Sequence, residues 1–170
     1  MRLLRSLLTV CVAATMSGCA GYRLGPTGGQ MAGEKSVQIV PFANRTPEAR
    51  LADAVTRALR KELQRDGTFR LGTRDAGDII VTGALIRYER REVSLVLTDV
   101  ATARDYNVSL TAQVTARERN SGKVLFDRPV TSLTLVRVGP DLPSSERQAL
   151  PLLATELARR VIALRADGSW

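Results

Sequence analysis

The side chains that most often perform chemistry in enzymes are scarce in this chain of 170 residues. It contains no histidine, and its cysteines are Cys11 and Cys19. Without imidazole the chain lacks the usual general base and the commonest transition-metal ligand. A serine or threonine nucleophile could still be activated by lysine, but Lys35, Lys61 and Lys123 lie in no recognisable motif. We therefore expect no enzymatic activity, no metal site and no cofactor.

Paired carboxylates are the remaining candidates for acid–base chemistry. Asp75 with Asp78, and Glu89 with Glu92, are the nearest pairs in the sequence, and arginines stand beside both. A solvated, ion-paired surface explains such pairs better than a catalytic site does.

The first 18 residues have the composition of a secretory signal peptide. Arg2 and Arg5 form a basic start, an apolar run covers residues 7–16, and Ser17 and Gly18 are the small residues expected before a cleavage site. The apolar run is too short to span a bilayer. We expect residues 1–18 to be removed.

Cys19 follows Ser17 and Gly18 directly, and this sequence resembles the lipobox of bacterial lipoproteins, although Leu is more common at the position of Met16. In that family the thiol is diacylated, the peptide is cut before the cysteine, and the new amine is acylated. The resemblance implies that Cys19 is the lipidation site. Ala20 follows it instead of the aspartate that retains lipoproteins in the inner membrane, so we expect a lipid anchor in the outer membrane of a Gram-negative bacterium, on the periplasmic side. The alternative is an ordinary secretory signal with an incidental cysteine.

The chain is strongly basic. Its net charge is +8, and removal of Arg2 and Arg5 would leave +6. A basic surface favours an acidic partner, and secretion excludes most nucleic acid. Lipopolysaccharide, anionic lipid headgroups and the cell wall remain. The planar arginine fork binds phosphate in a bidentate manner, which suits a lipid A phosphate. The alternative is that the excess of arginine reflects a GC-rich genome.

Composition divides the rest of the chain into a leader and one domain. Residues 19–35 are rich in glycine and predict a lipidated, flexible leader. Residues 36–170 are long enough to bury a core of their own and predict a single α+β domain.

Four strands are predicted from alternating or β-rich sequence. A short one covers residues 36–42 and is stopped by Pro41. Residues 79–97 are β-rich, with a bulge expected at Gly83 and a break or an exposed ribbon at the charged residues 87–92.

The last two predicted strands form a hairpin. Residues 104–117 alternate between apolar and polar side chains, which predicts one buried face and one solvent-exposed face. A turn at residues 120–122 leads to the return strand at residues 124–138, where Pro129 indicates an edge or a bulge. A further brief strand or turn is expected at residues 69–71.

Two apolar stripes predict helices. Thr46-Pro47-Glu48 opens the first helix and Gly67 ends it. A capping box at Ser145 and Gln148 opens the second, and Pro151 predicts a bent first turn or a start near Leu150. The stripes consist of Leu51, Val55, Leu59 and Leu63, and of Ala149, Leu153, Leu157, Val161 and Leu164.

The order of these elements predicts the fold. Three consecutive long strands with short links indicate an antiparallel meander, and the first strand joins it after a helical crossover. We expect a two-layer α+β sandwich, in which a mixed four-stranded sheet has two amphipathic helices on one face.

Five short segments, together with the order of elements, carry a resemblance to the LptE family of LPS-assembly lipoproteins. They are residues 18–24, 40–46, 67–71 and 78–83 and the strand around Tyr106. The resemblance implies a protein anchored in the outer membrane that partners and plugs the LptD barrel and binds lipopolysaccharide. It also implies a lipopolysaccharide site on the ribbon between the second and third strands and just after the fourth. In this chain the ribbon tip near Thr98 and Asp99 is not basic, which departs from the family pattern. Arg90, Arg91 and Arg104 flank the tip and Arg137 lies near the second position, and we expect Arg91 and Arg137 to be the contacts.

Residues 40–46 followed by a helix are also similar to two other kinds of outer-membrane lipoprotein. One kind activates peptidoglycan synthases, and members usually have a longer linker after the lipid. The other is the curli-secretion lipoprotein, which needs an amphipathic transmembrane hairpin that the charged residues 87–92 interrupt.

Overall fold

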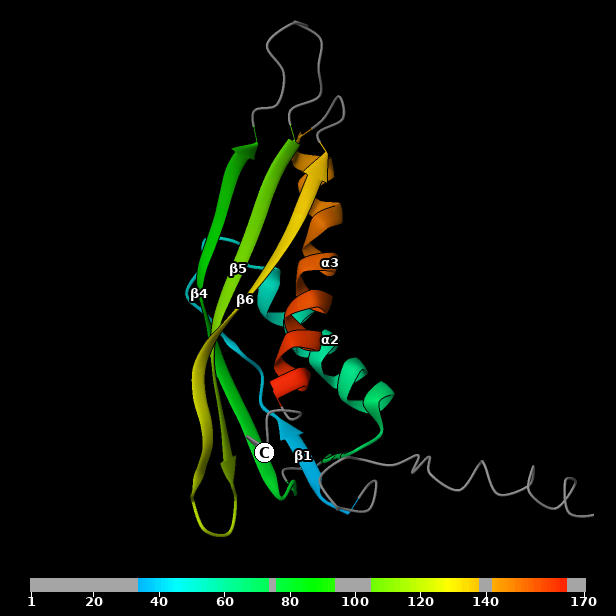
Figure 1. Ribbon diagram of the computed structural model, residues 1–170, viewed down its shortest axis with the longest axis vertical. Helices are drawn as coiled ribbons and strands as arrows, with labels where there is room; N and C mark the ends of the chain where they lie inside the picture. Colours follow the sequence, from blue (N-terminus) through cyan, green and yellow to red (C-terminus); the bar gives the residue numbers. More distant parts are fainter. Residues whose placement is uncertain (1–33, 74–75, 94–104, 138–141, 165–170) are drawn as a thin grey trace, which may run out of the picture.

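The computed structural model describes residues 34–73, 76–93, 105–137 and 142–164, which form one β-sheet and two helices (Figure 1). In chain order the elements are β1 (Ser36–Ile39), β2 (Ala43–Asn44), α2 (Leu51–Asp66), β3 (Arg70–Leu71), β4 (Ile79–Val93), β5 (Asp105–Glu118), β6 (Val124–Arg137) and α3 (Leu142–Ala163).

The sheet is mixed and has six strands in the order β3-β1-β4-β5-β6, with β2 pairing with β4 beyond the end of β1. The first three strands run parallel to their partners, whereas β4, β5 and β6 form the expected antiparallel meander. The α+β class is therefore confirmed, but the predicted count of four strands is wrong. Pro41 has no N–H for the ladder, so pairing stops there and resumes as β2, and the short segment after α2 pairs with β1 as β3.

The charged residues 87–92 do not break β4, which continues as an exposed ribbon to Val93. The predicted bulge at Gly83 is wrong, because the register shift lies between Leu85 and Arg87. Gly83 has a packing role instead. A Cβ atom at this position would lie 2.6 Å from Cζ of Phe42, so only glycine lets the phenyl ring approach the strand.

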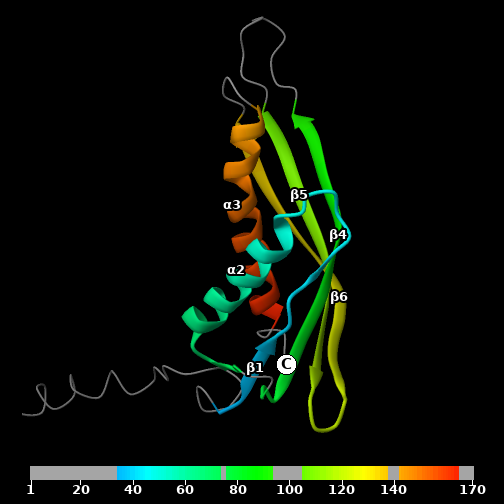
Figure 2. The same cartoon turned by 180° about the vertical axis from the view of Figure 1, so that it is seen from behind.

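One face of the sheet, here called the inner face, is covered. Figures 1 and 2 show both helices on this side. The inner face of β5 contributes Val108, Leu110, Ala112, Val114 and Ala116 to a single core, and the predicted stripes of α2 and α3 enter the same core. The opposite face, here called the outer face, has no element of the described chain packed on it.

The helix ends differ from the predicted ones. Thr46 does not cap α2, because its amide and hydroxyl both donate to Asn44 Oδ1 in a turn, and the helix begins at Leu51. Gly67 ends α2 as predicted, with φ of 72° and its N–H on the oxygen of Leu63. The second helix begins at Leu142, ahead of the predicted start, and runs through Pro151.

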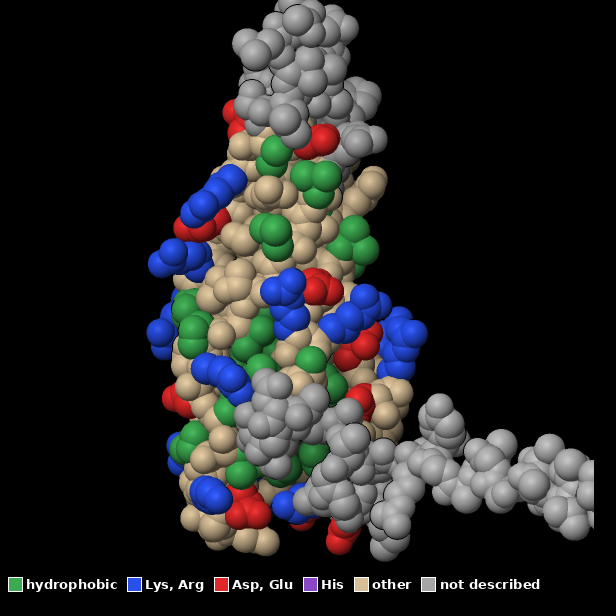
Figure 3. All heavy atoms as spheres, in the orientation of Figure 1, with side chains coloured by type: hydrophobic (Ala, Val, Ile, Leu, Met, Phe, Trp, Pro, Cys, Tyr) green, Lys and Arg blue, Asp and Glu red, His purple; other side chains and the backbone are tan. Residues whose placement is uncertain are grey.

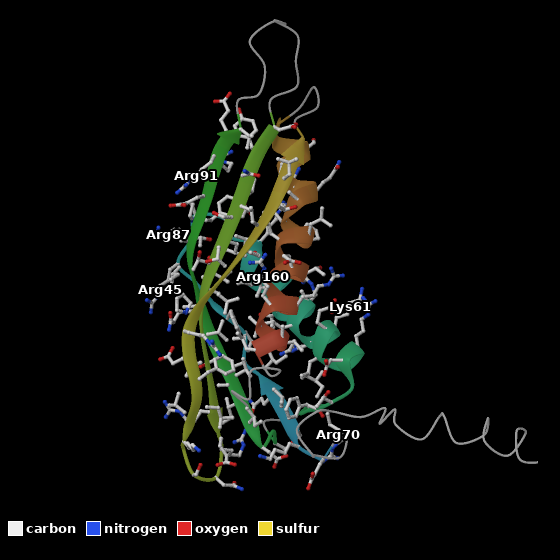
Figure 4. All side chains as sticks on the ribbon, viewed as in Figure 1. Arg45, Lys61, Arg70, Arg87, Arg91 and Arg160 are labelled. Carbon is white, nitrogen blue, oxygen red and sulfur yellow. The ribbon has the colours of Figure 1, made fainter. Side chains whose placement is uncertain are left out.

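Two sets of hydrogen bonds supplement the pairing of the strands, one at the edge of β6 and one at the base of β4. Arg160 of α3 donates to the main-chain oxygen of Thr131 at 2.9 Å, which occupies part of the free edge of β6 (Figure 4). At the base of β4, the amide and hydroxyl of Ser36 donate to Asp78 Oδ2 at 2.8 and 2.7 Å. The Ser36 hydroxyl, followed by the Ser36 amide, holds the pKa of the Asp78 carboxyl below its usual range.

Candidate functional site

The outer face carries a patch in which three rows of side chains cross β4, β5 and β6. Strand register places Arg91 beside Asn107 and Leu135, Glu89 beside Ser109 and Leu133, and Arg87 beside Thr111 and Thr131. These nine residues are called the outer patch below. Because residues opposite each other in a sheet share a face, the patch is charged along β4, uncharged and polar along β5, and mainly apolar along β6.

The charged edge of the outer patch is an ion-pair ladder. Glu89 lies between two arginines, and its carboxylate oxygens are 3.6 Å from Nη1 of Arg87 and 3.6 Å from Nη2 of Arg91. The arginine side chains are 67% and 80% exposed, so these pairs are solvated and each contributes less than about 1 kcal/mol to stability. An anion from solution can therefore reach both guanidinium groups.

A third arginine extends the ladder. The amide of Arg45 donates to the main-chain oxygen of Leu85 at 2.9 Å, which fixes its backbone beside β4 just below Arg87. Figure 4 shows Arg45, Arg87 and Arg91 in a column along this side of the sheet, and Figure 3 shows lysine and arginine side chains gathered there. The column is a concentration of positive charge with one interposed carboxylate.

The structure separates two of the predicted site residues. Arg91 pairs with Asn107 and belongs to the outer face, whereas Arg90 pairs with the buried Val108 and therefore belongs to the inner face. Both side chains are exposed, but they project from opposite faces of β4. They cannot grip the same small ligand from these positions.

The remaining predicted site residues are Arg137, Arg104 and Cys19. Arg137 is the last residue of β6 and pairs with Asp105, so its backbone is roughly 12 Å from that of Arg91 across two strands. Arg104 and Cys19 lie outside the described residues.

Sequence reasoning missed Arg45, Arg87, Leu133 and Leu135. The alternation of Arg87, Glu89 and Arg91 was a signal for a shared face, but the bulge at Ile86 hid which face it was. Leucine is usually buried, yet Leu133 and Leu135 on β6 are 52% and 55% exposed. Register against β5 places them on the outer face.

Other surface features offer less chemistry. A cavity of about 330 Å³ lies between β1, β3 and α2, and the Arg60 guanidinium on its wall already donates to the main-chain oxygen of Ile39 at 3.2 Å. In the described parts of the chain, no three acidic, cysteine or histidine residues gather as metal ligands would. The two described helices are too short or too polar to cross a membrane.

A family model for lipopolysaccharide assembly, LptE, matches residues 34–163. The chain belongs to the LptE family. This match confirms the family resemblance, and it covers every described strand and α2 and α3. The protein is thus a member of a family of LPS-assembly lipoproteins, a non-enzymatic class.

Solved structures with the same fold are distant in sequence. The hypothetical protein CT253 from Chlamydia trachomatis has a TM-score of 0.55 at 12% identity, over 79% of this chain and 96% of that one. Protein XCC0632 from Xanthomonas campestris has a TM-score of 0.50 at 14% identity, over 80% and 89% of the two chains. These similarities concern the fold alone. No significant match to a curated protein sequence was found.

Proposed function

We propose that this LptE-family protein is an outer-membrane lipoprotein that partners and plugs an LptD-like barrel, binds lipopolysaccharide and supports its assembly at the cell surface. The observation that carries the proposal is the family match over residues 34–163. The bare, polar outer face is compatible with it, because a plug must present a surface that another protein can cover.

The first element of the proposal is the anchor. Cys19 is the proposed acylation site, and its acyl chains would hold the protein on the periplasmic side of the outer membrane. Replacement Cys19→Ser should abolish incorporation of labelled palmitate and leave a soluble or unprocessed form. Palmitate still incorporated into this variant would exclude the lipobox.

The second element is the barrel. Below the outer patch, the outer face is a polar network in which Gln113 and Thr115 both donate to Asp127. Polar groups that are already hydrogen-bonded to one another can be covered by a partner at little further cost. We expect a one-to-one complex with an LptD-like barrel and loss of mature barrel when this protein is depleted.

Purification of the tagged, full-length chain from detergent-solubilised outer membrane tests this partnership. A normal barrel level after depletion, together with a peptidoglycan synthase in the purified material, would favour the synthase-activator function. A homo-oligomeric pore would favour the curli-type function.

The third element is lipopolysaccharide. Arg91 and Arg137 are the proposed contacts, with Arg90 and Arg104 as further candidates. Charge-assisted hydrogen bonds to phosphate contribute about 1.5–3 kcal/mol each when desolvated, and far less at an exposed rim. Lipopolysaccharide should bind more weakly to Arg91→Ala and to Arg137→Ala than to wild type. Binding by wild type should also weaken with salt, because exposed charges are screened beyond about 10 Å at 0.1 M.

Comparison of Arg90→Ala with Arg91→Ala then shows which face of β4 is used. A loss confined to Arg91→Ala places the ligand on the outer face. Salt-insensitive binding that is unchanged in the Arg91→Ala and Arg137→Ala variants would remove both residues from the site and favour genome composition as the reason for the arginine excess.

A further inference from the structure

All three rows of the outer patch run from a charged to an uncharged side chain, and two of them end on leucine. Each row begins with a charged residue on β4, passes through a small polar residue on β5, and ends on β6 with Leu135, Leu133 or Thr131. Neighbouring strands are about 4.8 Å apart, so the charged and apolar edges are separated by roughly 10 Å. A ligand that spans the patch must therefore carry negative charge at one end and apolar groups at the other.

The apolar edge is unusual within its own hairpin. The β5 residues of the inner face are buried, whereas Leu133 and Leu135 leave more than half of their surface in water on the outer face. Exposure of two adjacent leucines on one strand face costs free energy that a contact with acyl chains would recover. Figure 3 shows apolar side chains over β6 and α3 at the same end of the molecule.

The charged edge combines three cations with one anion. Arg45, Arg87 and Arg91 outnumber Glu89, so the column keeps a net charge of +2. Arginine binds phosphate oxygens through two parallel N–H donors, which a column of exposed guanidinium groups can offer. Glu89 contacts two of these groups, and a phosphate must compete with it for them.

We propose that the outer patch together with Arg45 is the docking surface for the lipid A part of lipopolysaccharide. Phosphate groups of lipid A bind along the column of Arg45, Arg87 and Arg91, an acyl chain lies on Leu133 and Leu135, and Glu89 acts as a resident counter-ion that limits the affinity. The inference rests on the proposed function and adds to it four contact residues and a determinant of affinity. Charge complementarity selects the phosphate, and the apolar edge selects a lipid over a free anion.

If Glu89 competes with phosphate, its replacement should raise the affinity for lipid A, which replacement of a merely structural residue would not do. Glu89→Gln keeps the shape of the side chain but removes the charge that competes with phosphate. We expect this variant to bind lipid A about 3- to 10-fold more tightly, and Arg45→Ala and Arg87→Ala to bind it more weakly by a similar factor. Leu133→Asn/Leu135→Asn should also weaken binding of lipid A.

The experiment uses the full chain purified in detergent, with labelled lipid A as probe. Unlabelled lipid A, phosphatidylglycerol and inorganic phosphate serve as competitors. Arg57→Ala on the exposed surface of α2 is the charge-matched control, and Leu152→Asn on α3, where the side chain is 62% exposed, is the apolar control. Neither control should change the affinity, and only unlabelled lipid A should displace the probe efficiently.

Three results would overturn the inference. If wild type binds lipid A and none of the patch variants changes the affinity, the docking surface is wrong and the proposed function stands. If phosphatidylglycerol or inorganic phosphate displaces the probe as well as lipid A does, the surface is a general anion site. If wild type does not bind lipid A although it purifies with the barrel, the ligand element of the proposed function fails, and the inference fails with it.

Discussion

The two faces of the β4–β5–β6 sheet are made by the same strands but have different surroundings. On the inner face, β5 presents Val108, Leu110 and Val114 to α2 and α3, and none of these side chains is more than 1% exposed. On the outer face, the intervening Asn107, Ser109 and Thr111 are only partly buried, and no described element covers them. Alternation along a single strand thus places a core on one side and a free surface on the other.

The difference between the faces separates stability from binding. Each fully buried leucine or valine contributes about 1.5–3 kcal/mol through burial, so changes on the inner face act on folding. The outer face has exposed ion pairs and cross-strand hydrogen bonds such as Thr111 to Thr131 at 2.9 Å, and these contribute little to folding. Changes there should act on whatever the face binds.

The largest difference in stability is expected between variants at two neighbouring residues of β5 that lie on opposite faces of the sheet. Leu110→Ala removes a fully buried side chain and should lower the free energy of unfolding by about 2–5 kcal/mol. Thr111→Ala on the outer face should change it by no more than about 0.5 kcal/mol. Urea unfolding of both variants measures the contrast, and similar losses would show that the outer face is also structural.

A substitution at Gly83 tests the close packing of the inner face by adding a side-chain atom instead of removing atoms. Gly83→Ala places a methyl group against the ring of Phe42, and overpacking of this kind costs about 1–3 kcal/mol. Thermal melting of Gly83→Ala, Phe42→Leu and the double variant measures the coupling. The double variant should be more stable than the sum of the single losses predicts, and strict additivity would mean that the two residues do not meet.

Asp78 provides a pH-dependent contrast at the base of the sheet. Its pKa is lowered in the folded state, chiefly by hydrogen bonds from Ser36, so its contribution to stability is present above the unfolded pKa and is lost as pH falls through the folded pKa. Urea midpoints between pH 6 and pH 2 should therefore fall more steeply for wild type than for Asp78→Asn. Parallel curves would show that this carboxylate is not a source of the acid sensitivity.

The smallest effect on folding is expected on the apolar edge of the outer patch. Leu133→Thr and Leu135→Thr replace half-exposed leucines with β-branched residues that suit a strand, so the melting temperature should barely change. A clear loss of stability would mean that the leucines belong to the fold, and their exposure would then say nothing about a ligand.

Much of the inner face was predictable from the sequence, and much of the outer face was not. The apolar stripe from Leu51 to Leu63 and the alternation after Tyr106 each depend on a local period, so they predicted the buried sides of α2 and β5 correctly. The β2 and β3 pairings involve two residues each and depend on tertiary contacts, which no local pattern records. The same is true of the bulge at Ile86, which changes the face of every later residue in β4.

The composition of the candidate site depends on strand pairing that the sequence does not reveal. Arg91 could be named from a family resemblance, but the arginines that flank it in space could not, because Arg45 approaches β4 through the unforeseen β2 pairing. Leu133 and Leu135 have the composition of core residues, and only the register with Ser109 and Asn107 places them outside. Strand register thus determines which side chains meet on the outer face, whereas the local period of apolar residues determines which side chains are buried on the inner face.

Photo-cross-linking in intact cells tests most directly the claim that the outer face is the binding face. A photoreactive amino acid at Ser109, in the middle row of the outer patch, is compared with one at Asp53 on the exposed side of α2. We predict products containing lipopolysaccharide from position 109, reduced by Arg87→Ala, and none from position 53. Products from position 53 but not from position 109 would contradict the account and place the ligand on the helical side of the molecule.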